Sequence, residues 1–447
     1  MKRHLFGTDG IRGHAGTEPV TPDTFFRLGK AAAIFFGKGR PRPRLLIGRD
    51  TRESGLALEH ALAAGFAAGG GEALKAGVLP TPAVALLVRR YKAQAGAVLS
   101  ASHNPYEDNG LKFFSPLGEK LTDAEEERIE ALLAGEALQH SKAPLGVVYD
   151  RPEAVESYRR FAVHSFPKGL TLKGMRVVVD CGHGATVVST PEVLRRLGAR
   201  VLVLGASPDG HNINRGCGST HPEAMLKAVR THKAHAGITH DGDGDRVLMA
   251  DEKGRLVDGD RMMAVCALGL AAHGKLPKRM LVATVMSNLG FEQALTQRGI
   301  KVLRAPVGDR YVLEMMKAQG AVLGGEQSGH VIFKKLLPTG DGLVTALQVL
   351  GAMRKAGQPL SKLAHFYEDV PQLLVNVKVA RRADLAQVKP VAQAIGAAEL
   401  ELAGTGRVLV RWSGTEPKAR VMIEGPDLRQ VHRLAHGIAK TIEKALS

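Results

Sequence analysis

Strand-like apolar runs that end in a glycine-rich or polar turn and then lead into a helical stretch recur along this chain. The runs cover residues 45–50, 177–180 and 281–285, and the alanine- and leucine-rich stretches that follow cover 55–68, 191–197 and 291–298. Alternating strand and helix signals are typical of helices layered around mainly parallel sheets. The three well-separated starts therefore predict three similar mixed α/β domains.

The last part of the chain follows a different pattern. Residues 373–379 alternate as a half-buried strand does, a helical pattern begins at Ala383, strands are expected at 407–412 and 419–423, and a helix at 427–446. These elements predict a small C-terminal α+β domain, with boundary signals at Gly357 and Pro371. The expected domains are 1–155, 156–256, 257–369 and 370–447.

The charge balance indicates an anionic partner. Lys and Arg number 61 and Asp and Glu 44, so the formal net charge is +17, which favours nucleic acid, acidic membranes or phosphorylated metabolites. Aromatic residues make up only 4% and the basic residues form no long block, which argues against a nucleic-acid-binding surface. No apolar run reaches the length of a membrane span, and three cysteines without a CxxC pair suit a reducing compartment. We therefore expect a cytoplasmic protein that binds neither membrane nor nucleic acid.

A candidate nucleophile follows the apolar run at 97–99. Ser102 lies in the SASHNP segment at 100–105, where Asn104 and Pro105 stiffen the turn. A hydroxyl at the end of a strand is presented for chemistry rather than hidden in the core. The alternative is an ordinary turn serine.

A candidate metal loop lies between the apolar runs at 236–238 and 247–249. Asp241, Asp243 and Asp245 alternate with glycines, and three carboxylates so close repel one another unless a hard cation neutralises them. Oxygen ligands alone suit Mg²⁺ better than zinc. A solvated acidic turn is one alternative. A calcium loop of the EF-hand type is disfavoured because Arg246 stands where that loop needs glycine.

The glycine-rich loop at 324–330 is a third candidate site. Glu326, Ser328 and His330 offer hydrogen bonds to sugar hydroxyls or to an amine, and the glycines allow close approach. An ordinary loop explains the segment equally well.

A fourth segment carries an anion signal. Arg411 and Arg420 flank the Ser413-Gly414-Thr415 turn, and guanidinium groups beside free hydroxyl and backbone N–H groups form a phosphate cradle. The alternative is a β-hairpin turn with surface arginines. The sequence contains no P-loop and no dinucleotide-binding fingerprint. Together the four segments favour phosphoryl transfer through a serine on a phosphorylated sugar.

These loops, in this order from residue 6 to the C-terminus, resemble the α-D-phosphohexomutase superfamily. The resemblance rests on FGTDG at 6–10, SASHNP at 100–105 and GEQSGH at 325–330. It implies three similar α/β domains and a mobile domain of the TATA-box-binding-protein type around a central cleft. NIN at 212–214, CGSTH at 217–221 and Gln327, where sister branches usually carry Met, resemble the branch that acts on phosphorylated glucosamine.

The resemblance also implies roles for individual residues. Ser102 is the phosphoserine nucleophile, and its phosphate binds Mg²⁺ together with Asp241, Asp243 and Asp245. Arg12, Lys112 and His330 match positions tied to acid–base work or charge stabilisation, and which of them moves the proton stays open. The expected substrate-binding residues are Arg246, Glu326, Ser328, Arg411, Ser413, Gly414, Thr415 and Arg420.

The implied reaction interconverts glucosamine 6-phosphate and glucosamine 1-phosphate. It passes through glucosamine 1,6-bisphosphate and supplies UDP-N-acetylglucosamine synthesis. Phosphomannomutase or phosphoglucomutase activity of the same superfamily is the alternative, and a basic nucleic-acid-binding protein is a remote one. The sequence leaves the oligomeric state open, and a homodimer is one candidate.

Overall fold

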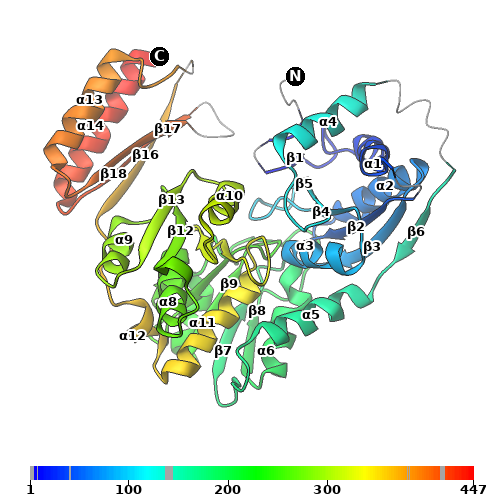
Figure 1. The fold of residues 1–447 in the computed structure, drawn as a ribbon, viewed down its shortest axis with the longest axis horizontal. Coiled ribbons are helices and arrows are strands. Elements are labelled where there is room, and N and C mark those ends of the chain that lie inside the picture. The colour runs from blue at the N-terminus through cyan, green and yellow to red at the C-terminus, as the bar shows by residue number, and fades with distance from the viewer. Residues whose placement is uncertain are drawn as a thin grey trace.

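The computed structural model describes residues 5–7, 9–39, 42–135, 144–379, 381, 383–412 and 418–446. They form four sheets, and each sheet with its helices is called a domain, numbered I to IV in chain order. Figure 1 shows domains I and IV on opposite sides above domains II and III. The first three sheets are mixed and the fourth is antiparallel, which confirms the predicted fold class.

Domain I is built on a six-stranded sheet. Its elements are β1 (Ile11–His14), α1 (Pro22–Phe36), β2 (Arg44–Arg49), α2 (Gly55–Ala68), β3 (Glu72–Val78), α3 (Thr81–Arg90), β4 (Ala95–Leu99), β5 (Asp108–Phe114), α4 (Asp123–Ala134) and β6 (Val147–Asp150). The strand order is β1-β5-β4-β2-β3-β6. Leu45 and Ile47 of β2 enter the core on one face and Leu46 enters the core on the other. A central strand buried on both faces needs a continuous apolar run, which is the pattern the sequence shows.

Domain II follows with a five-stranded sheet in the order β11-β10-β9-β7-β8. Its elements are α5 (Glu153–Ser165), β7 (Arg176–Asp180), a 3₁₀ turn at Ala185–Val188, α6 (Thr190–Arg196), β8 (Arg200–Leu204), α7 (Glu223–Thr231), β9 (Ala236–His240), β10 (Val247–Ala250) and β11 (Leu256–Val257). The parallel strands β7, β8 and β9 continue into an antiparallel hairpin of β9 and β10. The acidic loop is the connection of that hairpin.

Domain III carries a four-stranded sheet in the order β13-β12-β14-β15. Its elements are α8 (Gly259–Ala272), a 3₁₀ turn at Pro277–Arg279, β12 (Met280–Thr284), α9 (Leu289–Thr296), β13 (Lys301–Ala305), α10 (Asp309–Gln319), β14 (Leu323–Gly325), β15 (Val331–Phe333), α11 (Gly342–Ala356) and α12 (Leu360–Ala364). The GEQSGH loop connects β14 to β15, which pair as an antiparallel hairpin.

Domain IV has a three-stranded antiparallel sheet in the order β16-β18-β17, with two helices packed against it (Figure 1). Its elements are β16 (Gln372–Lys378), α13 (Lys389–Leu402), β17 (Arg407–Trp412), β18 (Lys418–Glu424) and α14 (Leu428–Leu446). The prediction that a helix begins at Ala383 is wrong. Asp384 instead forms a turn with the N–H of Ala386, and the helix begins beside Pro390, a residue favoured in a first helical turn.

Domains I, II and III share one continuous apolar core, whereas domain IV has its own. The shared core includes Leu46 of β2, Val177 of β7 and Leu281 of β12. Domain IV touches domain III through polar contacts such as that from the backbone N–H of Leu289 to the buried Glu424 carboxylate, 3.1 Å. No helix within the described ranges combines the length and apolarity needed to cross a bilayer.

A buried hydrogen bond fastens α5 to domain III. The Tyr158 hydroxyl lies 3.0 Å from both carboxylate oxygens of Asp341, and Asp341 caps α11 by accepting the N–H of Val344. Both side chains are buried, and burial raises the pKa of Asp341 to about 6.

We expect Tyr158→Phe to lower the free energy of unfolding by about 1–3 kcal/mol, because a buried carboxylate loses a hydrogen-bond donor while the ring is kept. Urea unfolding measures the change. Tyr149→Phe removes a hydroxyl from an exposed tyrosine and serves as the control, with an expected effect within about 0.5 kcal/mol. Equal stability of the two variants would contradict the contribution of the Tyr158–Asp341 bond.

Candidate active site

Ser102 occupies the turn that follows β4, at the carboxyl end of the strand. Its φ is +53°, an uncommon conformation for a residue with a side chain, and the residue is 1% exposed. The Ser102 hydroxyl donates to Asp241 Oδ2 across 2.7 Å. The structure therefore brings the predicted nucleophile of domain I against the acidic loop of domain II.

The acidic loop places its three carboxylates together in the interior. Asp241, Asp243 and Asp245 are buried, and one oxygen from each lies within 4.8 Å of the others. Gly242 allows the acidic loop to approach the Ser102 turn, because a Cβ there would stand 2.6 Å from the Ser102 carbonyl oxygen. Glu252, the residue that a calcium loop would use, instead accepts hydrogen bonds from Ser361. The triad is therefore closed by the serine and not by that glutamate.

The electrostatics of the triad suit a bound cation. Burial, together with the charges of Asp245 and Asp243, raises the pKa of Asp241 well above its ordinary value. Among the described residues, Asp243 Oδ1 and Asp245 Oδ1 are buried and have no hydrogen-bond partner. Oxygens of this kind are costly to bury unless a cation coordinates them, so the residues present fit a hard divalent ion.

Cationic side chains alternate with carboxylates around the triad. Lys112 Nζ lies 3.2 Å from Asp243, 3.3 Å from Asp9 and 3.7 Å from Asp245. Although burial opposes its charge, these carboxylates raise the pKa of Lys112, so that its side chain stays an ammonium. Arg12, another predicted residue, pairs with Asp9.

The same alternation continues toward domain III. Lys120 pairs with Asp9 and lies 2.8 Å from Asp309. His330 lies between Asp309 and Asp245, with nitrogen–oxygen separations of 3.4 and 3.7 Å, and its Nε2 accepts the N–H of Gly340. Groups from domains I, II and III thus close a ring of alternating charge.

The predicted sugar loop lies beside this ring. Glu326 accepts hydrogen bonds from the N–H of Gly308, 3.0 Å, and from the hydroxyl of Ser328, 3.0 Å. Arg246, whose backbone N–H donates to Asp241, turns its guanidinium toward His103 Nδ1 at 3.4 Å. Burial beside two arginines lowers the pKa of His103 to about 4, so its ring is neutral at pH 7.

Two arginines of domain IV form the opposite side of the site. Arg411 of β17 and Arg420 of β18 are direct partners in the antiparallel register. Burial and the charge of Arg420 lower the pKa of Arg411, and neither Nε has a partner within the described part of the chain. Two neighbouring guanidinium groups with free Nε–H donors suit an anion. Ser413, Gly414 and Thr415 lie outside the described residues.

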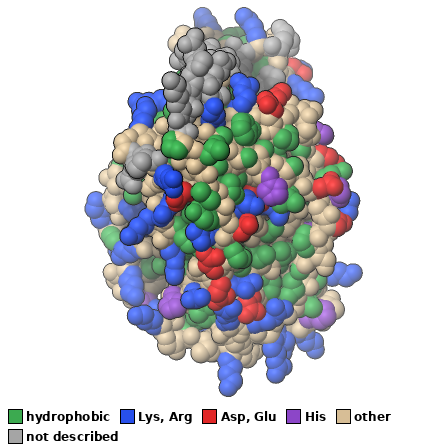
Figure 2. Space-filling view, turned by 90° about the vertical axis from the view of Figure 1, so that its right-hand side faces the viewer, with side chains coloured by type: hydrophobic (Ala, Val, Ile, Leu, Met, Phe, Trp, Pro, Cys, Tyr) green, Lys and Arg blue, Asp and Glu red, His purple; other side chains and the backbone are tan. Residues whose placement is uncertain are grey.

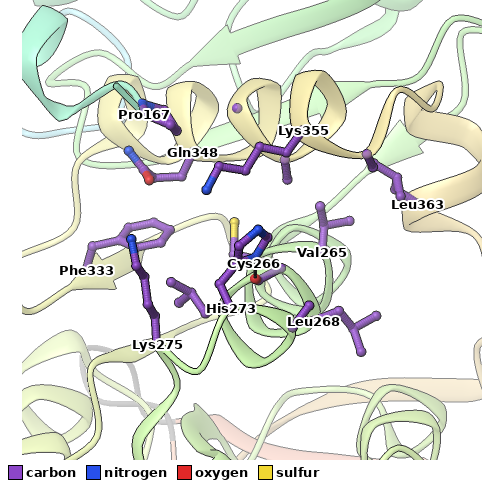
Figure 3. Close-up of a pocket in the computed structure, with 16 residues that line it drawn as sticks. Pro167, Val265, Cys266, Leu268, His273, Lys275, Phe333, Gln348, Lys355 and Leu363 are labelled. Carbon is purple, nitrogen blue, oxygen red and sulfur yellow. Dashed lines mark hydrogen bonds between the residues drawn. The ribbon is translucent and has the colours of Figure 1, made fainter. Parts of the chain in front are cut away.

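A cavity of about 610 Å³ lies between the charge ring, the sugar loop and the two arginines, and Ser102 itself is not one of its lining residues. Its lining draws on all four domains and includes Asp9, Lys120, Asp245, Arg246, Asp309, Glu326, His330, Arg411 and Arg420. A second hollow of about 350 Å³ lies between α8 and α11, and Figure 3 shows Val265, Leu268, Phe333 and Leu363 around it. That hollow is mainly apolar, so the charged cavity is the one that suits a phosphorylated ligand.

Three residues of the ring were not predicted from the sequence. Asp9 lies in the recognised FGTDG segment but had no assigned role, and Asp309 follows a glycine at the start of α10. Lys120 forms an isolated β-bridge with Phe114 before α4, and no sequence signal marks it. Their roles arise from the approach of domain I to domain III.

Four family models match the chain in succession. The alpha/beta/alpha domains I, II and III of the phosphoglucomutase/phosphomannomutase family match residues 3–140, 156–254 and 258–370, and the C-terminal domain of that family matches residues 374–441. The chain belongs to the phosphoglucomutase/phosphomannomutase family and is therefore an isomerase of the phosphohexomutase class.

Individual relatives and solved structures are similar to the chain over nearly its full length. The chain is 52% identical to a phosphoglucosamine mutase from Symbiobacterium thermophilum, with 99% of both chains covered, and 49% identical to one from an Anaeromyxobacter species, with 100% and 97% covered. A phosphoglucomutase/phosphomannomutase family protein from Burkholderia thailandensis has the same fold, with a TM-score of 0.82 at 21% identity over 99% of this chain and 97% of that one. N-acetylphosphoglucosamine mutase from Aspergillus fumigatus, solved with GlcNAc-6P and magnesium, has a TM-score of 0.64 at 18% identity over 100% and 96%.

We expect Mg²⁺ to raise the thermal unfolding temperature of the protein, because it neutralises three buried carboxylates. A Mg²⁺ concentration one hundred times its dissociation constant raises the free energy of unfolding by about 2.7 kcal/mol. Differential scanning calorimetry with and without MgCl₂, at constant ionic strength, measures the shift. Asp243→Asn loses most of it, whereas Glu223→Gln, at an exposed carboxylate of the same domain, keeps it. An undiminished Mg²⁺ shift in Asp243→Asn would count against the triad as the metal site.

Proposed function

We propose that this protein is a phosphoglucosamine mutase, which interconverts glucosamine 6-phosphate and glucosamine 1-phosphate. The observation that carries the proposal is the 2.7 Å contact between the Ser102 hydroxyl and the acidic loop at the edge of a charged cavity. Relatives at 48–52% identity over nearly the whole chain carry that name, which supports the choice of amino sugar.

Phosphorylated Ser102 donates its phosphoryl group to O1 of glucosamine 6-phosphate. The bond from phosphorus to Oγ breaks as the bond to O1 forms, and the O1 proton passes to a group of the protein. The resulting glucosamine 1,6-bisphosphate reorients, and the bond from phosphorus to O6 breaks as a new bond to Ser102 Oγ forms. O6 takes up the proton that the protein received from O1, and glucosamine 1-phosphate is released. Because Ser102 gives one phosphoryl group and receives another in each cycle, the enzyme ends the cycle phosphorylated as it began.

Asp241, Asp243, Asp245 and the Ser102 phosphate are the ligands we propose for Mg²⁺. When bound, the ion supplies neutralisation of phosphoryl charge, which is the main requirement of this chemistry. The support from this chain is the pair of unpartnered carboxylate oxygens, and the Aspergillus fumigatus relative was solved with magnesium.

The remaining residues hold and polarise the substrate. We propose Arg12, Lys112 and His330 for acid–base work or charge stabilisation beside the nucleophile, and each of the three is a candidate for moving the O1 proton. Glu326 and Ser328 bind the sugar, and Arg246 contacts the reacting phosphate. Arg411 and Arg420, with Ser413, Gly414 and Thr415 as their proposed companions, bind the distant phosphate. Arg411 and Arg420 face each other as like charges, and their Nε atoms have no hydrogen-bond partner within the described ranges, which supports an anionic ligand.

We propose a cytoplasmic location and domain spans of 1–155, 156–256, 257–369 and 370–447 for this enzyme.

The competing idea of a nucleic-acid-binding protein derives from the net charge of +17. In Figure 2, which presents the domain I side of the molecule, Lys and Arg are spread among acidic and apolar side chains and form no single basic patch. A gel-shift assay at physiological salt separates the two ideas, since duplex or RNA binding there would favour the second.

We expect Ser102→Ala to abolish mutase turnover while leaving the thermal unfolding temperature within a few degrees of wild type, because the change removes one oxygen from a turn. A coupled assay for glucosamine 1-phosphate measures the rate. Ser115→Ala, in a turn of the same domain, is the matched control and keeps full turnover. Full activity of Ser102→Ala would refute the assignment of the nucleophile.

Substrate preference tests the choice of sugar. We expect kcat/KM to be highest for glucosamine 6-phosphate among glucosamine, mannose and glucose 6-phosphates, measured with the same preparation at saturating Mg²⁺. A clear preference for mannose 6-phosphate or glucose 6-phosphate would place the enzyme in a sister branch and leave the nucleophile assignment untouched.

A further inference from the structure

The loop that carries Ser102 is held from behind by two side chains that donate to the same pair of carbonyl groups. Arg52 Nη2 donates to the carbonyl oxygens of Ser102, 3.0 Å, and Asn104, 2.8 Å. Asn214 Nδ2 donates to the same two oxygens at 2.9 and 3.0 Å. Each carbonyl thus receives a hydrogen bond from domain I and a second one from domain II.

Arg52 anchors the loop within domain I. Its side chain is fully buried and also donates to the carbonyls of Asp108 and Pro105, while its Nε pairs with Asp50 at 2.8 Å. Asp50 in turn accepts a hydrogen bond from the hydroxyl of Ser100. The Ser100 hydroxyl oxygen itself accepts a hydrogen bond from the backbone N–H of Ser102. This network fixes the shape of the turn within domain I, and none of these bonds reaches the acidic loop.

Asn214 links the backbone of the turn to domain II, in addition to the Ser102–Asp241 contact. It lies in the NIN segment of domain II, is 7% exposed, and its backbone N–H donates to the carbonyl of Gly182. A Cβ on Gly242 of the acidic loop would stand 2.9 Å from Asn214 Nδ2. The amide therefore lies in contact with the acidic loop on one side and bonds the nucleophile loop on the other.

The conformation of Asn214 is itself specialised. Its φ is +59°, a value that asparagine and glycine tolerate better than other residues. Two carbonyl acceptors at hydrogen-bond distance also fix which end of the amide carries the nitrogen. An asparagine at this place satisfies the backbone and the two carbonyls together.

We propose that Asn214 is a positioning residue, which holds the Ser102 oxygen of domain I at the acidic loop of domain II. The inference deepens the proposed mutase function and rests on it. Phosphoryl transfer depends on alignment, and a displacement of about 1 Å costs up to about a hundredfold in rate. Loss of the Asn214 amide should therefore lower turnover without changing the groups that bind the sugar and its distant phosphate.

The test is Asn214→Gly, which accepts the same φ and removes the whole side chain, the amide included. Because Arg52 still donates to both carbonyls, we expect the thermal unfolding temperature to stay within a few degrees of wild type. We expect kcat to fall tenfold to a hundredfold while KM for glucosamine 6-phosphate changes less than about twofold. Asn212→Ala, on the same loop with its amide bonded only to backbone of that loop, is the matched control and keeps wild-type kcat.

The outcomes separate cleanly. Wild-type kcat in Asn214→Gly, or a raised KM with unchanged kcat, would overturn the positioning role. If the glycine variant does not fold, Asn214→Asp, which keeps the size and replaces the donor by an acceptor, is judged by the same split. Absence of mutase turnover in the wild-type enzyme would instead count against the proposed function.

Discussion

The structure depends on gathering three buried carboxylates and one hydroxyl at a single point between two domains. Asp241, Asp243 and Asp245 repel one another in a medium of low dielectric constant, and burial raises the cost of their charges. Lys112 offsets part of that cost, and two carboxylate oxygens still lack partners among the described residues. The fold therefore maintains an electrostatic demand that a cation can meet, beside the Ser102 hydroxyl that we propose as the nucleophile.

Domains I to III and domain IV differ in how they are held together. One apolar core unites domains I, II and III, and the charge ring of Asp9, Lys120, Asp309, His330 and Asp245 joins the same three domains at the cavity. Domain IV has its own core and brings its arginines to the cavity from the outside. The groups proposed for the chemistry thus lie in one body, while the arginines proposed to bind the distant phosphate belong to domain IV, which contacts domain III through polar groups.

Much of this arrangement could be predicted from the sequence, because its central loops combine unusual residue types over a few positions. Ser102 follows an apolar strand, and the alternation of aspartate with glycine has few explanations besides a cation. Lys120, Asp309 and Arg52 could not be predicted, because each lies in an ordinary polar segment and acquires its partners from residues distant in the chain. Helix α13 shows the same limit on a local scale, since Pro390 and the Asp384 turn outweigh a helical pattern that begins at Ala383.

The most direct measurement is the mass and site of phosphorylation on the intact enzyme after incubation with a hexose 1,6-bisphosphate. On a chain of 47.6 kDa, one phosphoryl group is readily resolved, and peptide mapping locates it. The account predicts one phosphoryl group per chain, on Ser102, that passes to added glucosamine 6-phosphate. A phosphoryl group on another residue, or one on Ser102 that the sugar phosphate never removes, would contradict it.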